Sequence, residues 1–457
     1  MVADIQEIIF SNFQLSKQRS GSPQIGEEVT RTAQRHSHVP YSAETDFEEL
    51  LSRDKGLRDC RKQYKGDKVP GARYLTVSKV LRPPTSLAYV GTNTSEVHAL
   101  LDLQGSGRPQ TVRVLKNLAQ PNSVAWYNGT LFVAEPNRLL RYNGADDCVL
   151  SGKPLPAPVV VLSPIAPLDP NSKVIGFGPD GRLYISINAA CTSTGCSCGG
   201  QVIPGNDLLT YCSIAYLLPN GTDFRSEIKG IRKTGGLAFD PSSTAPFIAY
   251  TSQMPDDAAY RNVDDLFYYQ FVYALTDLGS PLCQWTGRGS PVVRSIGPGN
   301  VTADSNLTVT SLLNNPAGTS KARNAYCQDN IVKPSQALGP QVGATGMRFY
   351  TGAQPGYNTG VEFPKRFVNF TAFVAERGSL TNPQRPGFRV ASVRVTNGNG
   401  TSTSHVNFAS GWLINGVPWG RPVDVQPLLD GSLLISDELA GAVYRVTYSK
   451  SSNLDGT

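Results

Sequence analysis

Eight cysteines are among the residues of this 457-residue chain that can carry out chemistry. Three of them fall in CTSTGCSC, residues 191–198. This spacing differs from the CxxC pairs of zinc sites, and no His lies near, so disulfides are favoured over zinc. Seven Asn-x-Ser/Thr sequons begin at Asn93, Asn128, Asn220, Asn300, Asn306, Asn369 and Asn399. Both features are typical of an oxidising compartment, and we expect a secreted or luminal protein.

Histidine is the usual general base near neutral pH, and this chain has only four. They are His36, His38, His98 and His405, so none falls between residues 99 and 404. Chemistry that needs an imidazole base therefore has few candidates here.

The charge pattern excludes some classes of function. With 42 Lys and Arg against 36 Asp and Glu the net charge is +6, and no basic cluster indicates a nucleic-acid-binding face. Residues 1–60 carry a net charge of −3, which leaves +9 on the rest. That excess suits a polyanionic small ligand, although solvated surface cations explain it as well. No run of 18 apolar residues predicts a membrane-spanning helix.

The elements that must position these residues are strands. An apolar alternating stretch, an Asn-Gly or Asp-Gly turn and a second apolar stretch recur along the chain. The clearest copies are SVAWYNGTLFVAE (123–135), KVIGFGPDGRLYISI (173–187) and VDVQPLLDGSLLISDE (423–438), with weaker ones in 85–103, 235–252 and 345–379. Six such units predict an all-β fold, a six-bladed β-propeller with loop insertions over residues 61–450. A two-sheet sandwich is the alternative, but it rarely holds so many residues.

The two ends of the chain lie outside the predicted propeller. Residues 1–60 are polar and have no sustained periodicity, and we expect a poorly ordered leader. This leader has no basic region followed by an apolar stretch, so no signal peptide is visible. Residues 451–457 form a short tail.

Several motifs in order along the chain resemble the glucose/sorbosone dehydrogenase family. They are GFGPDGRLYISI with the nearby Cys cluster, KGIRKTGGLAFDP, GSPLC, GMRFYTG with FVAERGS, and WGRPVDVQPLLDGSLLISDELAGAVYRVTY. The resemblance runs from about Thr76 to Tyr448. It implies a six-bladed propeller that uses pyrroloquinoline quinone and calcium to oxidise sugars.

The resemblance also shows where this chain departs from the family. The family's catalytic His lies just before the GPDG hairpin, where Asn171 and Ser172 stand here. A second His precedes GMRFY, where this chain has Gln341. The family string His-Gly-Ser-Trp-Asn-Arg appears as RGSLTN, with Arg377 in place of His and Leu380 in place of Trp. The expected catalytic His is thus absent, and the catalytic residue is unknown.

Cationic side chains match the family's cofactor contacts better. The resemblance implies that Arg232 and Arg421 face the tricarboxylate cofactor, with Lys233 and Arg377 nearby, because planar guanidinium groups suit carboxylates. Either of the first two Arg residues could instead clamp a loop by donating to backbone carbonyls.

Calcium and one disulfide follow from the same resemblance. The stretch SQMPDDAAYRNVDD corresponds to the calcium loop, with the carbonyls of Met254 and Pro255 as ligands. Acidic residues there add negative charge: Asp256, Asp257, Asp264 and Asp265. The alternative is that these acidic residues belong to a solvated loop and bind no metal. Cys283 and Cys327 bracket the insertion after GSPLC, and we predict a disulfide between them.

Three functions follow from these observations. The first is a quinone-dependent aldose or sorbosone dehydrogenase whose activity is in doubt because the His is missing. The second is a non-catalytic secreted propeller that binds a sugar, a glycan or another protein. The third is a calcium-dependent lactonase-like propeller, which the absent His disfavours equally.

Overall fold

The structure is a computed structural model. It describes part of the chain between residues 72 and 448: the stretches 72–77, 86–92, 94–102, 109–165, 173–188, 190–192, 195–197, 201–203, 206–241, 247–253, 264–271, 276–277, 283–285, 301–303, 334–357, 360–396 and 402–448. The leader (1–60) and the tail (451–457) lie outside these residues, as do large parts of the predicted insertions.

Six main sheets follow one another along the chain, and we number them as blades 1 to 6. Blade 1 contains β1 (Ala72–Val77), β2 (Ser86–Thr92), β3 (Val97–Asp102) and β4 (Gln110–Leu115). Blade 2 contains β5 (Ser123–Tyr127), β6 (Thr130–Ala134), β7 (Leu139–Tyr142) and β8 (Val159–Leu162). Blade 3 contains β9 (Ile175–Phe177), β10 (Leu183–Ile187), β15 (Ser213–Leu217) and β16 (Arg225–Lys229), and β20 (Thr276–Asp277) pairs with β16.

The second half of the chain repeats this plan. Blade 4 contains β17 (Thr234–Phe239), β18 (Phe247–Ser252), β19 (Asp264–Phe271) and β23 (Gln336–Pro340). Blade 5 contains β24 (Ala344–Phe349), β25 (Thr371–Glu376), β26 (Arg389–Val395) and β27 (Ser402–Ala409). Blade 6 contains three described strands, β30 (Pro422–Pro427), β31 (Leu433–Asp437) and β32 (Ala442–Val446).

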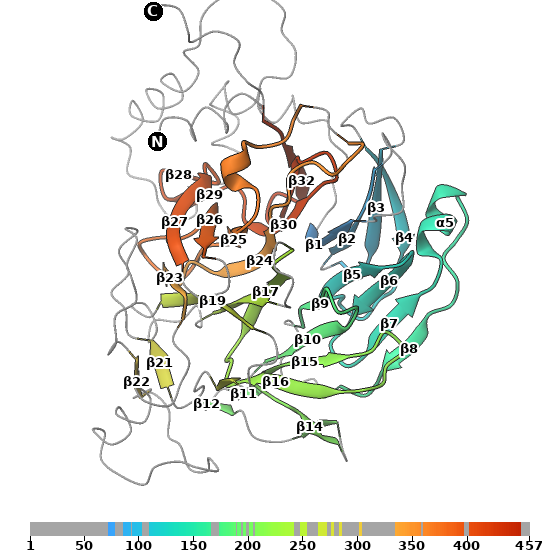
Figure 1. Ribbon diagram of the computed structural model, residues 1–457, viewed down its shortest axis with the longest axis horizontal. Helices are drawn as coiled ribbons and strands as arrows, with labels where there is room; N and C mark the ends of the chain where they lie inside the picture. The colour runs from blue at the N-terminus through green and yellow to red at the C-terminus, as the bar shows by residue number, and fades with distance from the viewer. Residues whose placement is uncertain are drawn as a thin grey trace, which may run out of the picture.

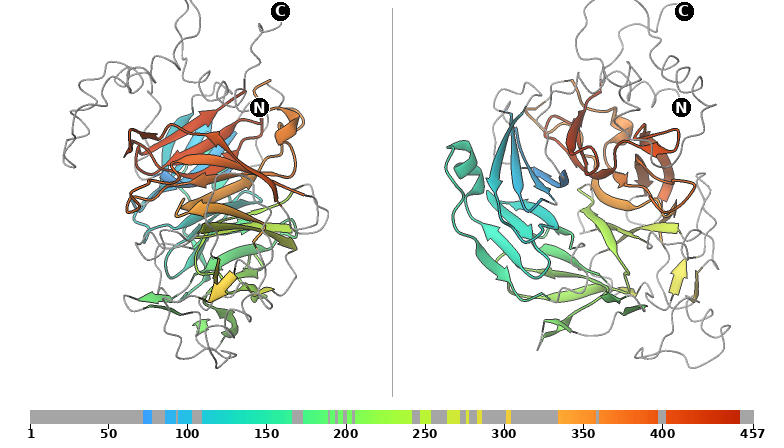
Figure 2. Two further views of the ribbon diagram at one scale, coloured as in Figure 1. Left: turned by 90° about the vertical axis from the view of Figure 1, so that its left-hand side faces the viewer. Right: turned by 180° about the vertical axis from the view of Figure 1, so that it is seen from behind.

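The blades close into a ring. The first strand of each blade contacts the first strand of the next, in the order β1, β5, β9, β17, β24, β30 and back to β1. Figure 1 shows the blades around this ring from blue to red, and Figure 2 shows them from the side and from behind. The six-bladed propeller is therefore confirmed, and the sandwich alternative is wrong because each sheet packs on two neighbours rather than on one.

The turns predicted from Asn-Gly and Asp-Gly pairs join the first two strands in three blades. In blade 2, Asn128 and Gly129 have φ values of 46° and 72°. Gly181 and Gly431, at the equivalent turns of blades 3 and 6, have φ values of 74° and 80°. These left-handed conformations suit the twist of a tight hairpin and cost glycine little.

Apolar side chains fill the spaces between blades. One cluster joins blades 1 and 2, a second joins blades 2 and 3, a third joins blades 4 and 5, and a fourth joins blades 5 and 6. Near the centre, β17 and β24 approach so closely that a Cβ on Gly236 would meet the Thr345 carbonyl oxygen. A Cβ on Gly346 would likewise meet Asp424. Glycine at these positions allows the innermost backbones to pack together.

Few described residues are helical, as the all-β prediction requires. They are α5 (Ala145–Leu150) and a single 3-10 turn, η2 (Lys365–Phe367). Four short two-stranded ribbons complete the described structure: β11 (Ala190–Thr192) with β12 (Gly195–Ser197), β13 (Gln201–Ile203) with β14 (Asn206–Thr210), β21 (Cys283–Trp285) with β22 (Val301–Ala303), and β28 (Leu413–Ile414) with β29 (Val417–Pro418). No described helix is long and apolar enough to span a membrane.

Candidate functional site

Most of the predicted site residues that are described lie on one face of the ring. Strands alternate in direction within a blade, so the connections between blades and those between second and third strands emerge on the same side. Between-blade connections carry Arg232, Lys233, Gln341 and Arg421, and a second-to-third connection carries Arg377. We call this side the site face. Asp264 and Asp265 also reach it, because β19 starts there.

Gln341, at one of the positions where a His was expected, is part of a buried amide pair. Its side chain is 2% exposed, and its Oε1 accepts a hydrogen bond of 3.0 Å from Nδ2 of Asn382. The backbone of Asn382 is in turn held by a 2.8 Å bond from its N–H to Oγ of Ser379. An amide does not take a proton near neutral pH, so this pair positions a loop and cannot act as a base.

Two guanidinium groups share one carboxylate on the site face. Nη1 of Arg377 lies 3.4 Å from Oε1 of Glu438, and Nη1 of Arg421 lies 3.2 Å from the same oxygen. In these two ion pairs, two cations of the described part of the chain share one anion, so the three side chains together carry a net positive charge. The Arg377 side chain is 29% exposed, whereas that of Arg421 is 12% exposed, so Arg377 is the more accessible cation.

The remaining donors of Arg421 hold the neighbouring loop. Its Nη2 donates to the Gly378 carbonyl at 2.8 Å, and its Nε lies 3.4 Å from the Arg377 carbonyl. With Nη1 on Glu438, every edge of this guanidinium faces a partner within the protein. The structure thus shows Arg421 as a clamp between blades 5 and 6, the alternative role that the sequence left open. A cofactor contact through Arg421 stays a prediction.

The predicted cationic residues of blade 4 lie just before β17. Arg232 and Lys233 are both half-buried. The Lys233 carbonyl accepts a 2.8 Å bond from the Gln253 N–H, and the Thr234 N–H donates to Asn188 Oδ1 at 2.9 Å. These bonds tie the connection to the ends of the second strands of blades 3 and 4. Cofactor contacts by Arg232 and Lys233 stay predictions.

Of the predicted calcium residues, Asp265 is described and Met254, Pro255 and Asp256 lie outside the described residues. Asp265 is fully buried, and its Oδ2 accepts bonds from the N–H groups of Gly343 (2.7 Å) and Ala344 (3.1 Å). This carboxylate therefore fixes the connection between blades 4 and 5. Within the described part, no group of three His, Cys, Asp or Glu side chains could hold a metal ion. The calcium site stays a prediction.

The two described histidines lie on outer strands. His98 is on β3, where its Nε2 lies 2.9 Å from Oε2 of Glu96. His405 is on β27, and its Nε2 lies 2.7 Å from Oε1 of Glu376. Neither is on an innermost strand or on a connection between blades. Asn171 and Ser172, at the other expected His position, lie outside the described residues.

The described cysteines give a partial view of the disulfides. Cys212 is fully buried and disulfide-bonded, and Cys148 is free. Cys191 and Cys196 stand opposite each other in the β11–β12 ribbon. Cys283 is the first residue of β21, but Cys327 lies outside the described residues, so the bond between them stays a prediction.

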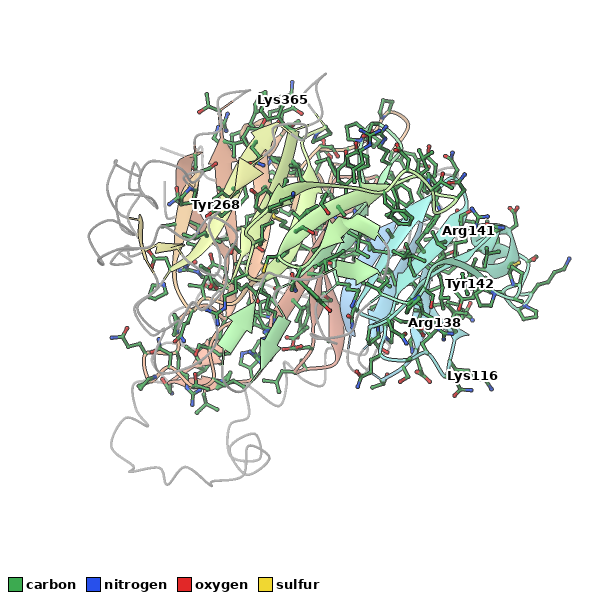
Figure 3. All side chains as sticks on the ribbon, turned by 90° about the horizontal axis from the view of Figure 1, so that it is seen from below. Lys116, Arg138, Arg141, Tyr142, Tyr268 and Lys365 are labelled. Carbon is green, nitrogen blue, oxygen red and sulfur yellow. The ribbon has the colours of Figure 1, made fainter. Side chains whose placement is uncertain are left out.

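Sequence reasoning missed Glu438 and Asn382, which organise the site face. Glu438 directly follows the second strand of blade 6, as Glu135 does in blade 2, and Glu376 is the last residue of the second strand of blade 5. Glu135 accepts from the Ala119 N–H at 2.7 Å and pairs with Arg138, which Figure 3 shows near Arg141 and Tyr142 on blade 2. An acidic residue ending a copy of the repeat was the signal that could have identified Glu438.

Solved structures with this arrangement of blades include a Trichoderma reesei protein of carbohydrate-active enzyme family AA12, in a structure described as a calcium structure. It has a TM-score of 0.62 and 16% identity, over 83% of this chain and 93% of that one. The holo PQQ domain of a Coprinopsis cinerea pyranose dehydrogenase has a TM-score of 0.60 and 13% identity, over 83% and 93%. The resemblance predicted from the sequence is confirmed in the fold.

Further comparisons add little about function. A glucose dehydrogenase structure has a TM-score of 0.50 and 14% identity, over 84% of this chain and 98% of that one. No protein-family model matches the chain. An uncharacterized protein of Borreliella burgdorferi is 31% identical over 114 residues, which make up 25% of this chain and 28% of that protein. The match thus spans under a third of that relative's length.

Proposed function

We propose that the protein is a sugar dehydrogenase-like propeller that binds a carboxylate-bearing quinone, pyrroloquinoline quinone, and a sugar on the site face. The observation that carries this proposal is the pair of guanidinium groups that shares the single carboxylate of Glu438. The cluster has an excess positive charge on the face where propeller connections gather, and a multiply charged anion would balance it.

The chain's own residues fit such a cofactor through Arg377. The Nε of Arg377 is buried and has no hydrogen-bond partner among the described residues, and its side chain is partly exposed. Arg232 and Lys233 would add charge from blade 4. Arg421 would position the Arg377 loop through its bonds to the Arg377 and Gly378 carbonyls, and its own contact with the ligand stays a prediction. When bound, the quinone would accept a hydride, which is two electrons and one proton, from the sugar carbon that bears the hydroxyl, while the hydroxyl proton would go to a base.

Oxidation of a sugar also requires a base at the hydroxyl, and this requirement separates two candidate functions. The amide pair of Gln341 and Asn382 occupies one of the expected positions, which favours the second candidate, a propeller that binds a sugar or a protein without oxidising it. A lactonase-like activity remains the third candidate and would need calcium ligands from outside the described residues.

Cofactor retention and turnover test the proposal. Purified protein would be incubated with pyrroloquinoline quinone and calcium, desalted, and assayed for quinone absorbance and for aldose-dependent dye reduction. Retention with turnover supports a dehydrogenase. Retention without turnover supports a binding protein, and restoring His by Gln341→His would test whether only the base is missing. No retention would contradict the proposal.

Arg377→Gln is the variant that tests the site residue. We expect about tenfold weaker retention, because loss of one charge-assisted contact costs about 1.5 kcal/mol. Arg225→Gln is the matched control, since the Arg225 side chain is 60% exposed and pairs with Asp223 on blade 3. Equal retention by the two variants would remove Arg377 from the site.

We also propose that the chain is secreted or luminal. Three of the sequon asparagines are described, and all of them, Asn128, Asn220 and Asn369, are exposed. Cys212 is disulfide-bonded, which suits the same compartment. Expression through a eukaryotic secretory pathway, with a mass shift on glycosidase treatment, would support the proposal. An unglycosylated protein with every cysteine reduced would contradict it.

A further inference from the structure

We propose that residues 153–158 of blade 2, the sequence KPLPAP, are a docking segment for a partner protein that has an aromatic groove. The docking segment lies between α5 and β8, and it is neither helix nor strand. All of its residues are exposed except Leu155, which is partly buried and packs on the apolar cluster that joins blades 1 and 2. In Figure 1, α5 and β8 lie on the outer rim of the ring, so the segment between them is accessible there.

Alternating prolines restrict the conformation of the docking segment. In Pro154, Pro156 and Pro158 the ring holds φ near about −65°. Each residue that precedes one of these prolines is restricted to extended conformations by contact with the proline ring. The sequence therefore favours a polyproline II helix over the whole segment before any partner binds.

Both ends of the docking segment are anchored to the propeller. Before it, Gly152 follows α5 with a φ of 68°, and the Lys153 N–H donates to the Cys148 carbonyl at 2.8 Å. After it, β8 begins at Val159, which pairs with Arg141 of β7. A segment that is restricted by its prolines and held at both ends loses little conformational freedom on binding.

The docking segment presents hydrogen-bond acceptors and apolar surface to solvent. Among the described residues, no hydrogen bond reaches the carbonyls of residues 154–158. Seven large apolar side chains are exposed in the described part of the chain, and three of them flank this segment: Leu150 (40%), Val159 (41%) and Val160 (53%). Exposed apolar side chains that gather in one place mark an interaction surface more often than those scattered singly.

These features fit a groove lined by Tyr and Trp side chains. Aromatic rings pack against proline rings, and their hydroxyl and indole N–H groups donate to the free carbonyls of a polyproline II helix. With three residues per turn, Lys153 and Pro156 share one exposed ridge of this helix. Pro154 and Ala157 share a second exposed ridge, whereas Leu155 faces the core. The partner would contact these two ridges and offer an acidic side chain to the Lys153 ammonium.

The docking segment is separate from the site face. It belongs to the connection between the third and fourth strands of blade 2, and such connections emerge on the opposite side of the ring. The proposal is therefore independent of the proposed function. The competing explanation is that the prolines only keep the edge of β8 from pairing with another strand, in which case the segment binds no groove.

Titration of the full-length chain with two aromatic-groove domains tests the proposal. The probes are an isotope-labelled WW domain and an isotope-labelled SH3 domain, because both bind Pro-rich segments through such grooves. We expect at least one of them to bind, and the double variant Pro154→Ala/Pro156→Ala to raise its Kd about tenfold. The matched control is Pro355→Ala, at an exposed proline in a loop of blade 5, which should leave the Kd unchanged.

A peptide and a stability measurement complete the test. A synthetic peptide of residues 150–161 should compete with the full-length chain for the same domain, and a peptide with the two alanines should compete about tenfold more weakly. The Tm of the double variant should equal that of the wild type, which shows that the weaker binding is local. Binding of neither domain, or an equal Kd for the wild type and the double variant, would overturn the proposal. Aggregation of the double variant without any change in Kd would assign the prolines to edge protection alone and would also overturn it.

Discussion

Blades 5 and 6 each place a fully buried carboxylate at the end of their second strand, yet the two carboxylates have opposite pKa shifts. Glu376 ends β25 and Asp437 ends β31. Burial alone would raise the pKa of Glu376, but Arg389 and His405 outweigh it and lower the pKa below its ordinary 4.5. Burial raises the pKa of Asp437 above its ordinary 3.8, and hydrogen bonds from Arg421, Ala440, Tyr444 and Leu439 only partly oppose it.

The difference lies in the charge of the partners. Glu376 has a guanidinium on one oxygen and an imidazole on the other. Asp437 accepts bonds from backbone N–H groups and from the Tyr444 hydroxyl, none of which carries a charge. Both carboxylates are fully buried and Asp437 accepts four bonds against two for Glu376, yet only Glu376 has a lowered pKa, because a cation offsets desolvation more completely than dipoles do.

Removing the cation beside Glu376 should have the largest effect. We expect Arg389→Met to lower the free energy of unfolding by about 3 kcal/mol, since a buried carboxylate loses its main counter-charge. Urea unfolding at neutral pH measures the change. Arg394→Met, at an exposed position of the same strand, is the control and should cost less than about 1 kcal/mol. Equal losses of unfolding free energy in the two variants would show that the ion pair of Arg389 with Glu376 stabilises the protein no more than an exposed arginine does.

Glu376→Gln should make the free energy of unfolding less dependent on pH in the acid range. Because the folded pKa of Glu376 is lowered, its contribution is present above pH 4.5 and is lost as the pH falls through the folded value. We expect the variant to be less stable than the wild type by about 2 kcal/mol at neutral pH, with a difference that shrinks in acid. Parallel curves for the two proteins down to acid unfolding would contradict the assigned shift.

Asp437→Asn should remove a dependence of the opposite sign, a loss of stability as the pH rises. The folded pKa of Asp437 is raised, so its contribution is greatest below pH 3.8 and is lost as the pH rises through the folded value. We expect the wild type to lose about 1 kcal/mol relative to the variant over that rise. Denaturant unfolding between pH 3 and pH 7 measures the slope. A slope of the same sign as that of Glu376→Gln would remove the contrast between the blades.

The smallest effect is expected where a pair is exposed. Arg225→Gln removes a surface partner of Asp223, and the loss should stay below about 0.5 kcal/mol at any pH. A larger loss in the same urea titrations would mean that burial is not what separates the two kinds of pair.

Much of the fold could be predicted from the sequence because its signals are local. Asn128-Gly129 and the equivalent Asp-Gly turns mark the hairpins, and apolar alternation marks the strands beside them. The ring closure of β1 on β30, and the glycines that let β17 and β24 approach, depend on contacts between distant segments. No window of sequence contains that information.

Less of the site could be predicted. The gathering of Arg232, Gln341, Arg377 and Arg421 on one face follows from motif order and the propeller topology. The partners of these residues do not: that Arg421 would clamp the Gly378 carbonyl, or that Glu438 would join two guanidinium groups, depends on side-chain geometry between blades.

Nearly every blade is built from one continuous stretch of chain, and this affects how the protein can fold during synthesis. Blades 1 to 5 can form in turn as their stretches emerge from the ribosome, each packing on the blade before it. β1, however, meets its partners in blade 6 only after almost all of the described chain has been made. One flank of the first blade therefore stays uncovered for most of translation, and closing the ring, a contact between distant segments, is expected to be the slow step.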